Sequence, residues 1–109
     1  MSKQITHDRQ AFHTWLEGRD PGDTVGWAGI SNRCPYAAFQ RIQYGWDYAS
    51  VGAIVTACYM DAMDQFQSRA NPRWLDQFVH DIDRDCDGRS GGRVTREDAL
   101  RVLDQIAEE

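Results

Sequence analysis

The residues of this chain best suited to chemistry are alternating carboxylates near its C-terminal end. Residues 81–88 read Asp-Ile-Asp-Arg-Asp-Cys-Asp-Gly, so Asp83, Asp85 and Asp87 alternate before Gly88. Carboxylates spaced in this way can point at one centre if the backbone curves tightly, and glycine permits such a turn. Clustered carboxylate oxygens are the ligands that a hard divalent cation prefers. The stretch therefore predicts a cation site.

Apolar residues with helical spacing flank this acidic stretch on both sides, which predicts a C-terminal helix–loop–helix. They are Trp74, Leu75, Phe78, Val79 and Ile82 before it, and Ala99, Leu100, Val102, Leu103 and Ile106 after it. Residues 74–106 as a whole resemble a degenerate EF-hand with an insertion in its loop. The resemblance implies a Ca²⁺ ion bound by Asp83, Asp85, Asp87 and Asp98.

The spacing of the acidic residues also permits an interpretation without metal. The twelfth loop position counted from Asp83 is Val94, so Asp98 closes the loop only if residues 89–92 are an insertion. Arg84 and Arg89 lie among the carboxylates and can neutralise them. In this alternative, the segment is an Asp- and Gly-rich turn whose carboxylates cap helices or pair with arginine.

Cys34 is the best nucleophile in the sequence, because Pro35 after it predicts a helix start and a helix N-terminus favours the thiolate. His13 or His80 would have to supply the base, and the local signatures of cysteine enzymes are missing. The alternative is a buried cysteine that only packs. The three cysteines, Cys34, Cys58 and Cys86, fit neither a disulfide framework nor a Cys-x-x-Cys metal site, so reduced thiols in the cytoplasm are expected.

An aromatic stretch with few aliphatic neighbours is the candidate partner-binding site. It comprises Trp27, Tyr44, Trp46, Asp47 and Tyr48. Exposed aromatic side chains are favoured anchors of protein interfaces. If the same rings are buried, they are instead part of the core.

Length and charge restrict the class of protein. The 109 residues predict a single domain, 1–109, and no apolar run approaches the ~20 residues of a membrane span. The net charge of −5 disfavours direct binding of nucleic acid and favours a protein partner with a basic surface. We therefore expect a cytoplasmic protein that binds neither nucleic acid nor membrane.

Helix signals predominate along the chain. They predict a first helix from about Thr6 to Gly18, a second from Pro35 to about Gly45, a third after Asn71-Pro72 and a last one capped by Thr95. Residues 24–29 and 48–56 have strand character. Residues 48–66 fit both patterns, and we predict a strand over 48–55 that leads into a helix ending near residue 68. The result is an α+β, helix-rich fold of four or five short helices with at most a small two- or three-stranded sheet.

One hydrophobic core is expected from the apolar stripes of these helices. Its predicted members are Phe12, Trp15, Leu16, Phe39, Ile42, Leu75, Phe78, Val79, Ile82, Val94, Leu100 and Leu103.

Segments around Val25-Gly26, Cys34-Pro35, residues 74–83 and residues 94–100 together resemble small uncharacterised bacterial and phage proteins. This resemblance implies no activity. No catalytic constellation is apparent, so the main hypothesis is a non-enzymatic protein-binding protein, such as a phage or mobile-element inhibitor of a host defence complex (anti-CRISPR-like). The alternatives are an EF-hand-like calcium-binding protein and a small cysteine-dependent enzyme.

Overall fold

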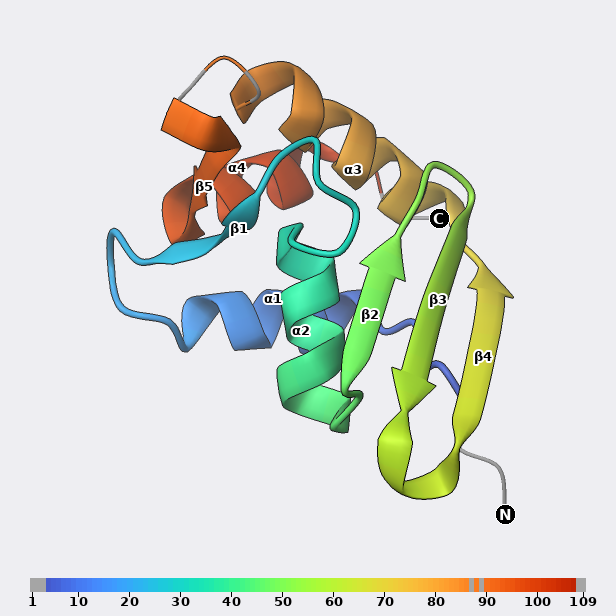
Figure 1. The fold of residues 1–109 in the computed structure, drawn as a ribbon. Coiled ribbons are helices and arrows are strands. Elements are labelled where there is room, and N and C mark those ends of the chain that lie inside the picture. Colours follow the sequence, from blue (N-terminus) through green and yellow to red (C-terminus); the bar gives the residue numbers. More distant parts are fainter. Residues whose placement is uncertain (1–3, 87, 89, 108–109) are drawn as a thin grey trace.

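The computed structural model describes residues 4–86, 88 and 90–107, which form four α-helices and five strands (Figure 1). The helices are α1 (Arg9–Glu17), α2 (Pro35–Tyr44), α3 (Arg73–Cys86) and α4 (Arg96–Gln105). The strands are β1 (Thr24–Trp27), β2 (Tyr48–Val51), β3 (Val55–Met60), β4 (Gln65–Ala70) and β5 (Arg93–Thr95). The predicted α+β class with four or five short helices is confirmed. No helix in the described ranges combines the length and the apolar character needed to cross a bilayer.

The strands form two separate antiparallel sheets. Strand β1 pairs with β5, while β2, β3 and β4 form a three-stranded sheet in that order. Residues 24–27 and 48–51 are strands as predicted, but they do not share one sheet. Strand β1 instead pairs with β5 and bends back onto the start of α2, where a Cβ at Gly26 would lie 2.5 Å from the backbone nitrogen of Pro35. Glycine is therefore required at this close approach.

The prediction of a helix that ends near residue 68 is wrong, because residues 55–70 form the hairpin β3–β4. Successive side chains of β3 alternate between the two faces of the sheet, with Thr56 and Cys58 buried on the inner face. A short 3-10 helix, η1 (Asp61–Met63), connects the two strands, and Asp64 after it has a left-handed backbone with φ of 45°. This turn interrupts any helix, since the left-handed conformation cannot continue one.

The core is built around Phe12 on α1. Its ring lies 5.0 Å from Tyr36 and 5.2 Å from both Phe39 and Phe78, measured between ring centroids. Each such pair is worth about 0.5–1.5 kcal/mol beyond the area it buries. Most predicted core residues are buried, and Val79 and Leu100 pack at the margin. Ile42 is a correction: it is 63% exposed, because the buried face of α2 does not include it.

Capping residues define where the helices begin. The Asp8 carboxylate accepts from the backbone N–H of Ala11, so α1 begins at Arg9 rather than at the predicted Thr6. The predicted cap of the last helix is confirmed: Thr95 and Asp98 form a reciprocal capping box at the start of α4.

The N-terminal segment is held against the inner side of the three-stranded sheet and against α2. Arg69 of β4 donates to the carbonyl of Ile5, and Gln40 of α2 donates to the carbonyl of Thr6, each over 2.8 Å. His7 stacks on Tyr36, and its Nδ1 lies 3.1 Å from the tyrosine oxygen. Burial, together with the nearby positive charge of Arg69, lowers the pKa of His7 from 6.5 to about 4.

This environment of His7 predicts a loss of stability in mild acid. The unfolded chain takes up a proton near its ordinary pKa of 6.5, whereas the folded chain resists protonation down to about pH 4. The free energy of unfolding is therefore fully retained above the unfolded pKa and falls as the pH drops towards 4. Denaturant titrations at about pH 7 and pH 5 should show a smaller decrease for His7→Gln than for the natural protein. An equal decrease in both proteins would contradict the assignment of this acid sensitivity to His7. His80→Gln, a substitution on the exposed surface of α3, is the control.

Candidate binding face

The outer face of the β2–β3–β4 sheet carries an aligned row of aromatic side chains. Tyr48 of β2 is paired in register with Tyr59 of β3, and Tyr59 is paired with Phe66 of β4. Tyr48 is 45% exposed and Phe66 is 62% exposed. Because paired residues in a sheet project from the same face, the three rings lie side by side across all three strands.

The rest of this outer face is small or apolar. The next row consists of Ser50, Ala57 and Ser68, and Val55 is paired with Ala70 beyond it. None of these positions carries a charged side chain. Figure 1 shows no helix in front of the three-stranded sheet, whereas the N-terminal segment passes behind it. We call this surface, formed by the outward residues of β2, β3 and β4, the sheet face.

Three carboxylates lie at the end of the sheet face that carries the aromatic row. Asp47 precedes β2, and its carboxylate accepts from the backbone N–H of Asp61 at 2.7 Å. Asp64 accepts from the hydroxyl of Tyr59 at 3.0 Å. The Asp64 carboxylate raises the pKa of Tyr59 above its ordinary value, with smaller contributions from Asp61 and Asp47. The aromatic row therefore ends in a negatively charged border.

Asn71 fixes the other end of the sheet against α3. Its side-chain oxygen accepts from Thr56 at 2.6 Å, and its amide nitrogen donates to the carbonyl of Gly52 and to Asp76, each at 3.0 Å. These bonds hold the turn between β2 and β3, where Ile54 is 71% exposed. The sheet face is thus a supported surface with apolar side chains at both of its ends.

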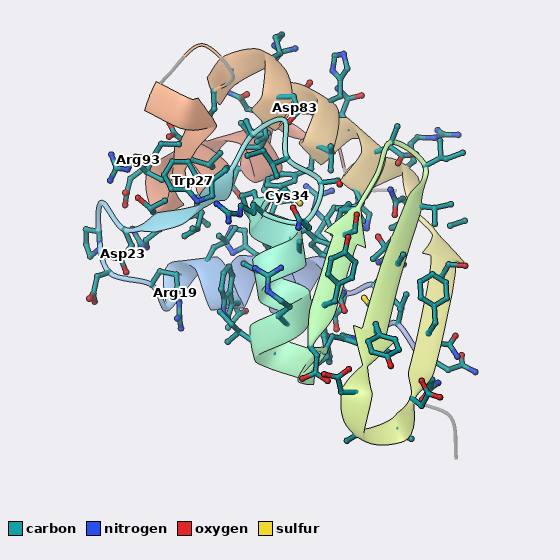
Figure 2. All side chains as sticks on the ribbon, in the orientation of Figure 1. Arg19, Asp23, Trp27, Cys34, Asp83 and Arg93 are labelled. Atoms are coloured by element: carbon teal, nitrogen blue, oxygen red, sulfur yellow. The ribbon has the colours of Figure 1, made fainter. Side chains whose placement is uncertain are left out.

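The structure separates the predicted partner-binding residues. Asp47 and Tyr48 lie on or beside the sheet face. Trp46 is only 2% exposed, so the prediction that it is a surface anchor is wrong, because its ring is part of the core. Tyr44 is half-buried against Phe39. Figure 2 shows Trp27 on β1, paired with Arg93 of β5, in the other sheet.

Sequence reasoning missed Tyr59 and Phe66 because it placed them in a helix. A signal for them was present: Val55, Ala57 and Tyr59 alternate with Thr56 and Cys58, which is the period of a strand. Helical spacing of other apolar residues in the same segment competed with that signal.

Three of the predicted metal ligands, Asp83, Asp85 and Asp98, lie in helices rather than in a loop. Helix α3 continues to Cys86, so Asp83 and Asp85 are helical residues two positions apart and project in different directions. Asp83 accepts from the backbone N–H of Gly29 at 2.8 Å, and Figure 2 shows it above the loop that follows β1. Asp85 forms an ion pair with Arg84 at 3.0 Å. Asp87 lies outside the described residues.

Asp98 is a helix cap in the structure. Its carboxylate accepts from the backbone N–H of Thr95 at 3.0 Å and from the hydroxyl of the same residue at 2.9 Å. Arg101 lies 3.3 Å from the other carboxylate oxygen. Across the ranges that the structure describes, no three His, Cys, Asp or Glu side chains converge as metal ligands. Asp85 and Asp98 thus make contacts of the kinds named in the alternative interpretation, an arginine pair and a helix cap, whereas Asp83 contacts the backbone of a loop.

The capping role of Asp98 predicts the effect of removing it. Asp98→Ala should lower the free energy of unfolding by about 1–2 kcal/mol, since the first turn of α4 loses its reciprocal cap. Asp85→Ala should cost less than about 1 kcal/mol, because it removes only a partly exposed ion pair. Thermal denaturation with and without millimolar calcium measures both. If calcium stabilises the natural protein and neither variant, the two carboxylates share a cation and the capping account of Asp98 is incomplete.

Cys34 lacks the environment of a nucleophile. It is buried at the N-terminus of α2 and lines a cavity of about 200 Å³ between the loop after β1, the β2–β3 turn and α3. Burial raises the pKa of its thiol to about 11, despite the favourable backbone hydrogen bonds of the helix start. The thiol is therefore protonated at neutral pH. His13 and His80 contact carboxylates instead of the thiol.

No family model, curated protein or solved structure matches this chain. The resemblances to an EF-hand and to phage proteins therefore stay predictions, and functional inference depends on the sheet face and its surroundings.

Proposed function

We propose that this protein is a non-enzymatic binding protein whose sheet face holds a protein surface that is basic and partly apolar. One observation carries the proposal: Tyr48, Tyr59 and Phe66 form an aligned row on a face without charged side chains, in which Tyr48 and Phe66 are exposed and Tyr59 between them is partly buried. Single exposed apolar residues are common on any protein. A contiguous uncharged face with aromatic rings is characteristic of interaction surfaces.

The acidic border specifies the chemistry of the partner. Asp47, Asp61 and Asp64 adjoin the aromatic row, and the whole chain has a net charge of −5. An arginine can stack on a tyrosine or phenylalanine ring while its guanidinium pairs with a carboxylate. A lysine can also meet such a border, although less specifically. Charge complementarity therefore favours a partner segment with basic residues next to apolar ones.

A nucleic-acid ligand fits this face less well. Rings on a sheet can stack with bases, but the affinity of such proteins depends on positive charge along the phosphate backbone. The border of the sheet face is negative. Within the class of protein-binding proteins, an inhibitor that occupies the basic nucleic-acid channel of a host defence complex, as an anti-CRISPR protein does, has a target of the required charge.

Selection from a library of short random peptides tests the chemical class of the partner before the partner itself is identified. Enriched peptides should contain arginine or lysine beside apolar residues. One enriched peptide is then synthesised, and its affinity is measured by calorimetry for the natural protein, for a Tyr48→Ser, Phe66→Ser double variant and for Ile42→Ser. The proposal requires that only the double variant loses binding.

Two results would overturn the proposal. Enrichment of acidic peptides would contradict the charge argument, and equal affinity of the double variant would place the binding site elsewhere. A parallel titration with single-stranded DNA tests the competing ligand. The DNA should bind only weakly, with the affinity that stacking of its bases on the aromatic rings provides.

A further inference from the structure

The outer edge of β4 offers unpaired backbone groups. Strand β4 is the last strand of its sheet, and in Figure 1 no described element lies along its outer edge. Proteins usually protect such an edge with proline, with lysine or with a covering segment. Strand β4 contains neither residue, and its one charged side chain, Arg69, is directed to the inner side, where it donates to Ile5.

The hydrogen-bond ladder between β3 and β4 identifies which backbone N–H and C=O groups of β4 are unpaired. The backbone N–H of Asn71 donates to the carbonyl of Ile54 at 2.8 Å, in line with the β3–β4 register. Bonded and non-bonded pairs alternate along an antiparallel ladder, so Arg69 and Gln67 exchange bonds with β3. The alternate residues direct their N–H and C=O groups to the outer edge, and they are Phe66, Ser68 and Ala70. In the described part of the chain, no backbone hydrogen bond links these three to a segment outside the sheet.

We propose that two copies of this protein pair in antiparallel fashion through the outer edges of β4, with Ser68 of each copy facing Ser68 of the other. Phe66 then faces Ala70 of the second copy. In this register, each of Phe66, Ser68 and Ala70 lies opposite a residue of the second copy that also has unpaired backbone groups. The side chains of these residues all lie on the outer face of the joined sheet. The inference goes beyond the proposed function, since it concerns an edge rather than the sheet face.

The distribution of charge favours antiparallel pairing with a second copy at this edge. Strand β4 is preceded by two carboxylates, Asp61 and Asp64, whereas Arg73 and Asp76, of opposite charge, follow it. Antiparallel pairing keeps the acidic ends of the two strands apart, whereas parallel pairing would place these like charges together. The joined sheet would have six strands with both aromatic rows on one face. A partner with two binding segments would then bind more tightly through avidity.

Analytical ultracentrifugation over a wide range of protein concentration tests this pairing. The natural protein should shift from its 12.5 kDa monomer mass towards twice that mass, with Kd of roughly 10–100 µM because the interface is small. Ser68→Pro removes an N–H that would bond across the pair, and edge strands tolerate proline there. We expect at least a tenfold weaker association for this variant and unchanged association for Ser68→Thr.

A second variant keeps the test decisive if Ser68→Pro fails to fold. Ser68→Lys retains the backbone donor but places two like charges opposite one another, so it should also remain monomeric. The proposal is overturned if the natural protein stays monomeric throughout or if Ser68→Lys associates as the natural protein does. Peptide binding to the sheet face is measured on dilute monomer, so failure of the pairing leaves the proposed function standing.

Discussion

Phe78→Ala is expected to lower the free energy of unfolding by about 3–5 kcal/mol, the largest loss of stability that we predict for a single substitution in this chain. The Phe78 side chain is completely buried, and its ring meets that of Phe12 edge-on at 5.2 Å. Removing it leaves a cavity between α1 and α3 in addition to the lost apolar burial. Chemical denaturation monitored by tryptophan fluorescence measures the change.

Ile42→Ala is the matched control for Phe78→Ala. Both residues fit the apolar stripes of their helices in the sequence, but Ile42 is exposed in the structure. Its truncation should change stability by no more than about 0.5 kcal/mol. Comparable losses of unfolding free energy for the two variants would show that α2 is rotated so that Ile42 faces the core.

The largest expected effect on binding follows from Phe66→Ala. The exposed Phe66 ring is the outermost member of the aromatic row, and an aromatic anchor at an interface is typically worth about 2 kcal/mol or more. A basic peptide that binds the natural protein should therefore bind the variant at least about 30-fold more weakly. Because Phe66 is exposed, the free energy of unfolding should change little, which separates this effect from that of Phe78→Ala.

Ile42→Ala again provides the comparison for binding, since it removes an equally exposed apolar side chain that lies on α2 rather than on the sheet face. Its affinity for the same peptide should equal that of the natural protein. A loss of affinity in both variants would mean that exposed apolar residues contribute without regard to position, and the sheet face would then have no special role.

The helices were predictable from sequence because their signals are local. A capping residue, a proline in the first turn and a 3.6-residue stripe all lie within a few positions of one another, as at Thr95 and Pro35. Strand pairing is not local. Nothing near Val25 in the sequence indicates that its strand pairs with β5 rather than with residues 48–56, because that choice depends on how the whole chain packs.

The segment after β2 shows why a periodic pattern can mislead. Ile54, Val55, Cys58 and Tyr59 fit a helical stripe, yet Val55 and Tyr59 project from one face of the sheet and Cys58 from the other. Two short strands, joined by a turn in which Asp64 has a left-handed backbone, accommodate the same apolar residues. The first of these strands also forms backbone hydrogen bonds with the edge of β2. A one-dimensional pattern contains no information about that unpaired edge, so the choice between helix and hairpin is made by tertiary structure.

The candidate site was only partly predictable for the same reason. Asp47 and Tyr48 were identified from local composition and lie at the sheet face. Trp46 is buried in the core, although strict strand alternation would place it on the same side as Tyr48, because the chain bends at Asp47 before β2 begins. Tyr59 and Phe66 reach Tyr48 only through the register of the three strands.

Chemical-shift mapping by NMR tests most directly whether the sheet face is the binding site. A basic peptide enriched from the random library is titrated into isotopically labelled protein, and the backbone amide signals are followed. We expect the perturbed amides to lie in β2, β3, β4 and their acidic border, including Tyr48, Tyr59 and Phe66. Perturbations confined to α1, α4 or the β1–β5 sheet, with the signals of the aromatic row unchanged, would contradict it.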